Sequence, residues 1–347
     1  MRKSSNGARV RPLLVKALAL VAFYVFIVMF VRLGWGVVTF DGCRSSSPLL
    51  WAGSARSNDM MRMPRRDFIE SAPLMSSTDL SMTTRDWSGS PVVAEELRLI
   101  YCDIPKNACT TMKRLLMRVR GHRNWNSTYG GDVHDPDVNG LTSMRDLDLT
   151  RANRIMHDAA SWTRLLIVRD PIARFAAAFL DKCSRVIYAK NHTRIVDGNC
   201  PLQDVDGSES ADRVLAKLEQ QAGQGALAAM NVHFRPQIQF CDLRRYAHSY
   251  VIIDVDALSH AMYALFDQID IPSDTKNITL TALHEISALD YTARHRTPSQ
   301  ALVQEWVDEA EACVRNERPS NASACDHMIA PRLRRLYADD YELLSIV

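Results

Sequence analysis

One stretch of the chain, residues 97–117, constrains the fold most, because its sequence changes from strand-like to helix-like across a short turn. It reads L-R-L-I-Y-C-D-I-P-K-N-A-C-T-T-M-K-R-L-L-M. Residues 99–101 form the apolar run of a strand, and Leu115 and Leu116 fall on the buried side of a basic helix. The first N–H groups of a helix have no partner inside the helix, so this junction predicts a binding site for an anion such as a nucleotide phosphate.

The turn and the first helical residues supply hydroxyl groups and positive charges to this predicted site. The candidate binding residues are Pro105, Lys106, Asn107, Ala108, Cys109, Thr110, Thr111 and Lys113. The turn contains no glycine and its lysine precedes the small residues, so it differs from the G-x-x-x-x-G-K-[ST] loop of ATP- and GTP-binding proteins. An ordinary surface turn before a basic helix is the alternative interpretation.

A second stretch, residues 162–185, repeats this order of elements. Residues 165–168 predict a short strand buried in a parallel sheet, Arg169 and the two residues after it end the strand, and residues 172–182 predict an amphipathic helix. An arginine at the carboxyl end of a parallel strand faces the crevice in which α/β sheets bind nucleotides. The two stretches together predict an α/β fold with a central parallel sheet and nucleotide-binding loops.

Four separated blocks resemble motifs of one family, the Golgi carbohydrate sulfotransferases of the chondroitin, dermatan and N-acetylgalactosamine 4-O-sulfotransferase type. They resemble the 5′-phosphosulfate loop Pro-Lys-x-[Ala/Gly]-Cys-Thr, the 3′-phosphate motif Val-Arg-[Asp/Glu]-Pro-Phe-x-Arg-Leu-x-Ser-Ala-Tyr-x-Asp-Lys, the segment His-[Trp/Phe]-x-Pro-Gln, and a C-terminal His-x-Thr segment. The matching residues are Pro105, Lys106, Ala108, Cys109 and Thr110; Val168, Arg169, Asp170, Pro171, Arg174, Ala178, Asp181 and Lys182; His233, Phe234, Pro236, Gln237 and Cys241; and His295 and Thr297.

The resemblance implies a single sulfotransferase-type domain over residues 92–347. Such a domain transfers a sulfuryl group from 3′-phosphoadenosine 5′-phosphosulfate (PAPS) to a hydroxyl of a glycan or proteoglycan, here expected to be a chondroitin/dermatan-type or N-acetylgalactosamine-containing chain. Lys106 is expected to act catalytically at the 5′-phosphate and the bridging oxygen, and Arg169 to bind the 3′-phosphate. No metal is expected.

The resemblance also implies roles for further residues. His134 lies between the two phosphate motifs, where related enzymes place a histidine near the acceptor hydroxyl, so it is the candidate general base. His157 and His233 are the alternatives. Additional cofactor contacts are expected from Asp170, Pro171, Arg174 and Ala177, and substrate contacts from His233, Arg235, Gln237 and His295.

One departure from the family pattern affects the predicted cofactor site. The family serine that contacts the 3′-phosphate is replaced by Ala177. Loss of one hydroxyl donor to a phosphate weakens binding by roughly 1–3 kcal/mol, unless another donor such as Ser184 or a loop amide substitutes. A catalytically impaired lumenal protein that keeps the fold and binds a glycan or a nucleotide is therefore an alternative function.

The N-terminal part of the chain predicts a membrane anchor. Residues 17–31 are an unbroken apolar run, and residues 13–33, with the side chains of Lys16 and Arg32 reaching to the interfaces, are long enough to span a bilayer. The basic residues before them place residues 1–12 in the cytosol by the positive-inside rule. Residues 34–91 are predicted to be a lumenal stem, because the chain from about residue 41 is rich in Ser, Met, Arg and Pro without apolar periodicity. A cleaved signal peptide is the alternative to the anchor.

With the family resemblance, this arrangement predicts a single-pass type II protein of the Golgi membrane with a lumenal catalytic domain. Four N-glycosylation sequons agree with it, at Asn126, Asn191, Asn277 and Asn321. A type II glycosyltransferase would share these features and is the alternative enzyme class. It should carry a D-x-D metal site, and residues 146–148 and 254–256 match that pattern only formally.

The net charge and the cysteines of the chain indicate which partners, metals and disulfides to expect. The net charge of +2 does not indicate a nucleic-acid partner. The eight cysteines contain no C-x-x-C pair, so zinc is not expected, and in an oxidising compartment some should form disulfides. Cys109 is predicted to be a buried thiol, and Cys43, at the membrane edge, would allow a cross-linked homodimer. The disulfide candidates are Cys183, Cys200, Cys241, Cys313 and Cys325.

Overall fold

A computed structural model describes residues 61–62, 90–126, 133–158, 160–183, 186–188, 194–196, 200–202, 210–288, 293–316 and 325–345. The predicted cytosolic tail (1–12) and signal anchor (13–33) lie outside these ranges, as does most of the predicted stem (34–91). None of the helices in the described ranges combines the length and the apolar character that a bilayer crossing requires.

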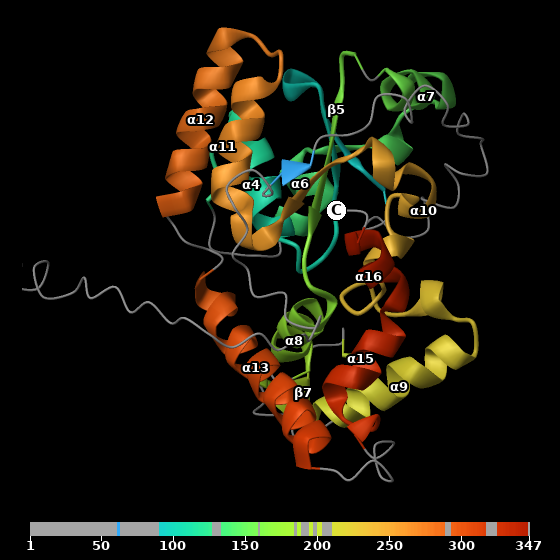
Figure 1. The fold of residues 1–347 in the computed structure, drawn as a ribbon. Coiled ribbons are helices and arrows are strands. Elements are labelled where there is room, and N and C mark those ends of the chain that lie inside the picture. The colour runs from blue at the N-terminus through green and yellow to red at the C-terminus, as the bar shows by residue number, and fades with distance from the viewer. Residues whose placement is uncertain are drawn as a thin grey trace, which may run out of the picture. The chain divides into compact units, whose positions relative to one another are not determined.

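The centre of the fold is a sheet that includes the long strand β5 (Figure 1). Its six strands follow the order β1-β8-β5-β3-β2-β4. In that order the strands are Met61–Arg62, Val251–Asp254, Thr163–Val168, Leu99–Cys102, Val92–Ala94 and Thr142–Ser143. The three middle strands, β8, β5 and β3, are parallel, which agrees with the predicted central parallel sheet. The outer strands pair antiparallel, so the sheet as a whole is mixed. The sequence did not predict these short flanking strands.

Strand β1 lies within the segment that was predicted to be a stem. Met61 pairs with Ile253 and Arg62 pairs with Ile252 of β8. The pairing gives hydrogen-bond partners to a strand that would otherwise form the edge of the sheet. At these two residues the chain is therefore part of the folded domain.

The register of the parallel strands brings their carboxyl ends to one edge of the sheet. Leu165 pairs with Tyr101 on one side and with Val251 on the other. The loops that follow β3 and β5 therefore start next to each other. This edge contains both predicted phosphate motifs, as expected for an open α/β sheet.

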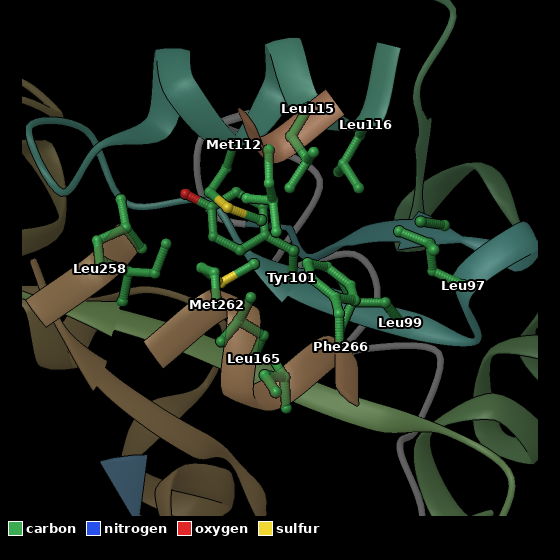
Figure 2. Close-up of a cluster of buried hydrophobic side chains, with 14 of the residues drawn as sticks. Leu97, Leu99, Tyr101, Met112, Leu115, Leu116, Leu165, Leu258, Met262 and Phe266 are labelled. Carbon is green, nitrogen blue, oxygen red and sulfur yellow. The ribbon is translucent and has the colours of Figure 1, made fainter. Parts of the chain in front are cut away.

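Apolar residues on both faces of the central strands bury the sheet between two layers of helices. One face packs against α4 (Cys109–Val119), α11 (Leu258–Gln268) and α12 (Ser273–Ala288). Figure 2 shows side chains of α4 and α11 gathered around Tyr101. The other face packs against α7 (Leu149–His157), α10 (Leu243–Tyr246) and α16 (Ala338–Ser345). Alternate residues of a strand point to opposite faces, so a run that is apolar throughout requires both layers.

A third apolar cluster lies beside the sheet and fixes the helix of the second motif. It joins α8 (Pro171–Lys182), α9 (Ala211–Gly223), α13 (Ala293–Asn316) and α15 (Ile329–Leu336) (Figure 1). The ring of Phe175 of α8 packs inside this cluster. Its centroid lies 5.7 Å from the ring centroid of Phe234 and 5.8 Å from that of Trp306. Phe175 stands where the family motif has leucine, and the larger ring fills this core.

The remaining elements are short. They are the helix α6 (Pro136–Asn139), the strands β6 (Val186–Tyr188) and β7 (Arg194–Val196), which pair with each other, and the 3₁₀ helices Glu95–Leu97, Met144–Asp146, Leu227–Ala229, Gln237–Gln239, Ala247–Ser249 and Val255–Ala257.

Residues 220–225, Gln-Gln-Ala-Gly-Gln-Gly, predict a loop between helices, but residues 220–223 continue α9 to Gly223. The helix ends where Gly225 adopts a φ of 69° and the N–H groups of Gly225 and Ala226 donate to the carbonyls of Ala222 and Gln221. These two bonds form a Schellman motif, in which glycine accepts the left-handed conformation that ends the helix. The prediction placed the helix end too early, because the two glutamines and the alanine before this glycine are good helix formers.

Three disulfides connect cysteines of the described chain. They are Cys102–Cys241, Cys183–Cys200 and Cys313–Cys325. All five candidates are bonded as predicted, but Cys102, the partner of Cys241, was not among them, because it lies inside β3. Cys109 has a free thiol and is half-buried rather than buried. Cys43 lies outside the described residues.

Candidate functional site

The loops after β3 and β5 are joined to each other by hydrogen bonds. The Arg169 guanidinium donates to the main-chain carbonyl of Lys106 at 3.2 Å, and the Asn107 amide donates to the carbonyl of Ile167 at 2.9 Å. The predicted 5′-phosphosulfate and 3′-phosphate motifs therefore form one surface at the carboxyl edge of the sheet.

The first of these loops adopts a glycine-like backbone without any glycine. Lys106 has a φ of 71° and Ala108 a φ of 58°, both in the left-handed region. Ala108 is the N-cap of α4, and no described side chain caps the amides of its first turn. These amides are open at the positive end of a helix, which is the arrangement expected for anion binding.

Arg174 connects this loop to the third motif. Its side chain is buried, and it donates to the carbonyls of Pro105 at 2.9 Å, Arg235 at 2.6 Å and Val232 at 3.1 Å. These contacts give Arg174 a positioning role that the sequence did not predict. A direct contact between Arg174 and the cofactor stays a prediction.

Gln237, predicted to bind substrate, is also buried and connects the two loops. Its carbonyl oxygen accepts from the Asn107 amide at 2.5 Å and from the Arg169 N–H at 3.2 Å, while its amide nitrogen donates to the Arg169 carbonyl at 2.8 Å. Asp340 of α16 accepts from the N–H groups of Gln237 and Ile238. Asp340 of the C-terminal helix α16 thus supports the site, a role that the sequence did not predict.

The side chain of Lys106 lies in a cluster of alternating charge. Its ammonium group is 2.5 Å from a carboxylate oxygen of Asp181, and Lys182 lies 3.1 Å from the same oxygen. Burial acts to raise the pKa of Asp181, but the charges of Lys106 and Lys182 hold it well below its usual value. Burial lowers the pKa of Lys106 despite the nearby carboxylate. Asp181 follows Arg174 by seven residues, a spacing that places both on one helix face.

His134 lies beside the first turns of α4. Its Nε2 is 3.1 Å from the Thr110 hydroxyl, and its Nδ1 is 3.3 Å from the Lys113 ammonium group. Lys113 in turn forms a buried ion pair with Asp103 at 2.6 Å. Burial, and then the charge of Lys113, lower the pKa of His134 to about 4. The structure therefore places the predicted base next to the predicted phosphate loop, in its neutral form.

The two alternative histidines differ in position. Burial, and then the charges of Lys106 and Lys182, lower the pKa of His233 to about 3, so this ring is within electrostatic reach of the charged cluster. The charges acting on His157 are those of Arg164 and Arg245, and Arg164 lies near the amino end of β5. His157 therefore belongs to the opposite edge of the sheet.

The second motif forms the start of α8. Asp170 is the N-cap, accepting from the Ala173 N–H at 2.9 Å, and Pro171 is the first helical residue. Asp170 also accepts from the Tyr341 hydroxyl at 3.3 Å. Ala177 is 6% exposed and follows Arg174 by three residues on the helix.

The remaining candidates are placed as follows. Thr111 lies in the first turn of α4, and Arg235 is buried, donating to the Met230 carbonyl at 3.3 Å and lying over the Phe240 ring. His295 is in α13, and its side chain is not described. Asn126 and Asn277 are exposed, whereas Asn191 and Asn321 lie outside the described residues.

Both D-x-D sequences form helix caps in the structure. Asp146 completes a capping box with Ser143, and Asp148 accepts from the Arg151 N–H as the N-cap of α7. Asp254 accepts from the N–H of Asp256 at 2.7 Å. Capping explains these acidic residues by their contribution to local structure.

The fold and the two joined loops, which contain the predicted phosphate motifs, agree with the class that the comparisons show. A model of the sulfotransferase family matches residues 91–345, and the chain is a member of that family. Carbohydrate sulfotransferase 8 of Homo sapiens is 33% identical over 90 residues, which are 26% of this chain and 20% of that protein. Carbohydrate sulfotransferase 11 of Rattus norvegicus is 30% identical over 103 residues, which are 30% of this chain and 29% of that protein. The similarity thus spans less than a third of these relatives, and no solved structure matches.

Proposed function

We propose that this protein transfers a sulfuryl group from PAPS to a hydroxyl of a glycan, and that the acceptor is a chondroitin/dermatan-type or N-acetylgalactosamine-containing chain. The observation that carries the proposal is the hydrogen bond from Arg169 to the carbonyl of Lys106, which unites the two phosphate motifs. Membership of the sulfotransferase family and similarity to two carbohydrate sulfotransferases support it.

The residues at this edge fit a ligand with phosphate groups at two positions. The open amides of α4, the ammonium group of Lys106 and the hydroxyls of Thr110 and Thr111 would hold the 5′ end, and Arg169 would hold the 3′-phosphate. PAPS supplies the sulfuryl group when bound. Lys106 would stabilise the negative charge that develops on the leaving bisphosphate.

We propose further that residues 13–33 anchor the chain in the Golgi membrane with residues 34–347 in the lumen. The exposure of Asn126 and Asn277 is compatible with glycosylation there. Removal of N-linked glycans from the full chain, produced in a eukaryotic host, should increase its gel mobility. An unchanged mobility would contradict the lumenal placement.

The test of function measures transfer of radiolabelled sulfate from PAPS to chondroitin, dermatan and N-acetylgalactosamine-terminated oligosaccharides. Wild type should label at least one of them. Lys106→Ala and Arg169→Ala should each weaken binding of 3′,5′-bisphosphate about tenfold or more, because each removes a charge-assisted contact to a phosphate. The matched controls are Lys276→Ala and Arg151→Ala, which remove cations that pair with Asp267 and Glu95 away from the site.

Each other outcome has a defined meaning. Bisphosphate binding without transfer to any acceptor would favour the impaired binding protein, for which Ala177 is the specific observation. Transfer of sugar from a nucleotide sugar would favour a glycosyltransferase. Absence of both bisphosphate binding and sulfate transfer would refute the proposed site. Equal bisphosphate binding by wild type and by the Lys106→Ala and Arg169→Ala variants would refute it as well.

A further inference from the structure

Two histidines approach the cluster formed by Lys106, Asp181 and Lys182, and their hydrogen bonds distinguish them. The charges of Lys106 and Lys182 act on both His134 and His233. Both rings are held neutral, so their charge state does not decide which one can accept a proton. What decides this is which nitrogen of each neutral ring carries the proton and which carries the free lone pair.

The lone pair of His134 is already engaged. The Lys113 ammonium group has only donors, so the Nδ1 atom 3.3 Å away must be the acceptor. The proton of the neutral ring is then on Nε2, where it donates to the Thr110 hydroxyl at 3.1 Å. Lys113 is itself fixed by the buried carboxylate of Asp103. His134 therefore has no lone pair available for a substrate proton.

The lone pair of His233 is placed differently. The main-chain N–H of His233 donates to Oδ1 of Asn231 at 3.0 Å, and because a main-chain N–H is always a donor, this contact identifies Oδ1 as the oxygen. The ring Nδ1 lies 2.8 Å from the same oxygen and must carry the proton. The lone pair is therefore on Nε2, and the hydrogen bonds described for His233 use only its main chain and Nδ1.

The turn that carries His233 is held in place relative to the phosphate loop. The carbonyl of Asn231 accepts from the N–H groups of Phe234 and Arg235. The Arg174 guanidinium donates to carbonyls on both sides of His233 and also to the carbonyl of Pro105, next to Lys106. One buried side chain thus positions both the loop and the turn, which is what a reacting group requires.

We propose that His233 is the general base of the transfer reaction and that Asn231 is the positioning residue that selects its tautomer; the proposal rests on the proposed sulfuryl transfer. The acceptor oxygen bonds to sulfur while the bond between sulfur and the 5′-phosphate oxygen breaks, and its electron pair leaves with the bisphosphate. The proton of the acceptor hydroxyl passes to Nε2 of His233. Atoms and charge balance without a further reactant.

The charged groups that act on His233 also couple its basicity to the donor. They are Lys106 from the loop and Arg174, Asp181 and Lys182 from α8; burial and then the three cations lower its pKa. An anion bound at Lys106 offsets these cations and raises the pKa of His233 towards the range useful for a base. The histidine should therefore become a stronger base only when the donor site is filled.

The kinetic test compares His233→Gln with His134→Gln in the full chain. Removing a general base should lower kcat about 100-fold or more, whereas binding of 3′,5′-bisphosphate should change less than about threefold. His134→Gln should chiefly raise KM for PAPS, since it affects the loop. Asn231→Asp should raise the pKa of His233 and move the acidic limb of the kcat profile to higher pH. A large loss of kcat in His134→Gln alone would assign the base to His134.

A spectroscopic test does not depend on activity. In the full chain labelled with ¹⁵N only in histidine, the His233 signals are identified by their loss in His233→Gln. They should show a proton on Nδ1, and adding 3′,5′-bisphosphate should raise the pKa of the ring. A proton on Nε2 instead, or an unchanged pKa in saturated protein, would overturn the proposal even if transfer is observed. Correct tautomer and pKa response with no transfer would instead refute the proposed function.

Discussion

At the scale of single residues, α8 shows how one alanine is placed in the candidate site. Arg174, Ala177 and Asp181 lie within a narrow stripe of the helix, because they are separated by three and four residues. On this stripe, Arg174 donates to the carbonyl of Pro105, and Asp181 accepts from the ammonium group of Lys106. The methyl group of Ala177 therefore faces the loop that contains Pro105 and Lys106.

Ala177→Ser should add a hydrogen-bond donor at the position where the family carries one. The apparent KM for PAPS is expected to fall about fivefold, which corresponds to about 1 kcal/mol, with a smaller effect on kcat, because the contact exists before and during the reaction. Steady-state kinetics checks this. Ala177→Asp should abolish activity by placing a second carboxylate near Asp181 and the phosphate.

Ala176→Ser is the matched control, since Ala176 belongs to the apolar cluster beside the sheet and is fully buried. The Ala176→Ser variant should have a lower free energy of unfolding and no lower KM for PAPS. A serine at position 177 that leaves KM unchanged would show that another donor already serves the phosphate. Full activity in Ala177→Asp would remove the 3′-phosphate from this helix.

At the scale of elements, the junction between β3 and α4 depends on a strained turn. Ala108 occupies the left-handed region, which costs a residue with a side chain about 1–2 kcal/mol relative to its usual conformations. Glycine adopts this region freely, but the conformational entropy that it loses on folding costs about 0.4–1 kcal/mol more than for alanine. The balance favours glycine at this position, where the family motif also allows it.

Ala108→Gly should therefore raise the free energy of unfolding by about 0.5–1 kcal/mol, seen as a rise of about 1–4 °C in Tm. Ala226→Gly is the control. Ala226 precedes the 3₁₀ helix Leu227–Ala229 at a φ of −94°, outside the left-handed region, so this substitution should lower the free energy of unfolding. Thermal unfolding of the two variants checks the difference. A lower Tm in Ala108→Gly would show that the turn is not strained.

The same junction marks what sequence could predict. The apolar run of β3, the basic helix α4, the strand β5 and the helix α8 follow from local patterns, and all four are confirmed. The strands β1 and β4 have two residues each, too few to show alternation, and they depend on pairing with distant strands. Local sequence contains no information on such pairing.

The candidate site shows the same division. Lys106 and Arg169 were identified from motifs and His134 from its place between them, and the structure brings all three to one edge of the sheet. Roles that depend on tertiary contacts were missed, such as Gln237 bridging the two loops. The proton position on a histidine likewise depends on neighbours that only the fold supplies.

At the scale of the whole molecule, the disulfide Cys102–Cys241 joins the end of β3 to the start of the segment that leads to α10. Its two cysteines are separated by 139 positions, whereas those of Cys313–Cys325 are separated by 12. Cross-linking restricts the unfolded chain more when the closed loop is longer. The first disulfide should therefore contribute more to stability.

Replacing Cys102 and Cys241 together by alanine should lower the free energy of unfolding by about 2–5 kcal/mol. The matched pair Cys313→Ala with Cys325→Ala should lose about 2 kcal/mol less, by the dependence on loop length. Equilibrium unfolding in urea measures both. Equal losses would show that local packing, rather than restriction of the unfolded chain, sets the contribution.

The long disulfide loop also has a topological consequence. The chain from Cys102 to Cys241 is a covalent ring, and Lys106, His134, Arg169 and His233 all belong to it. A single peptide cleavage inside the ring leaves both fragments attached, so a nicked molecule keeps every one of these residues. Segments outside the ring can be lengthened or exchanged during evolution without opening it. The ring is therefore a unit that can be inherited intact while the segments outside it change.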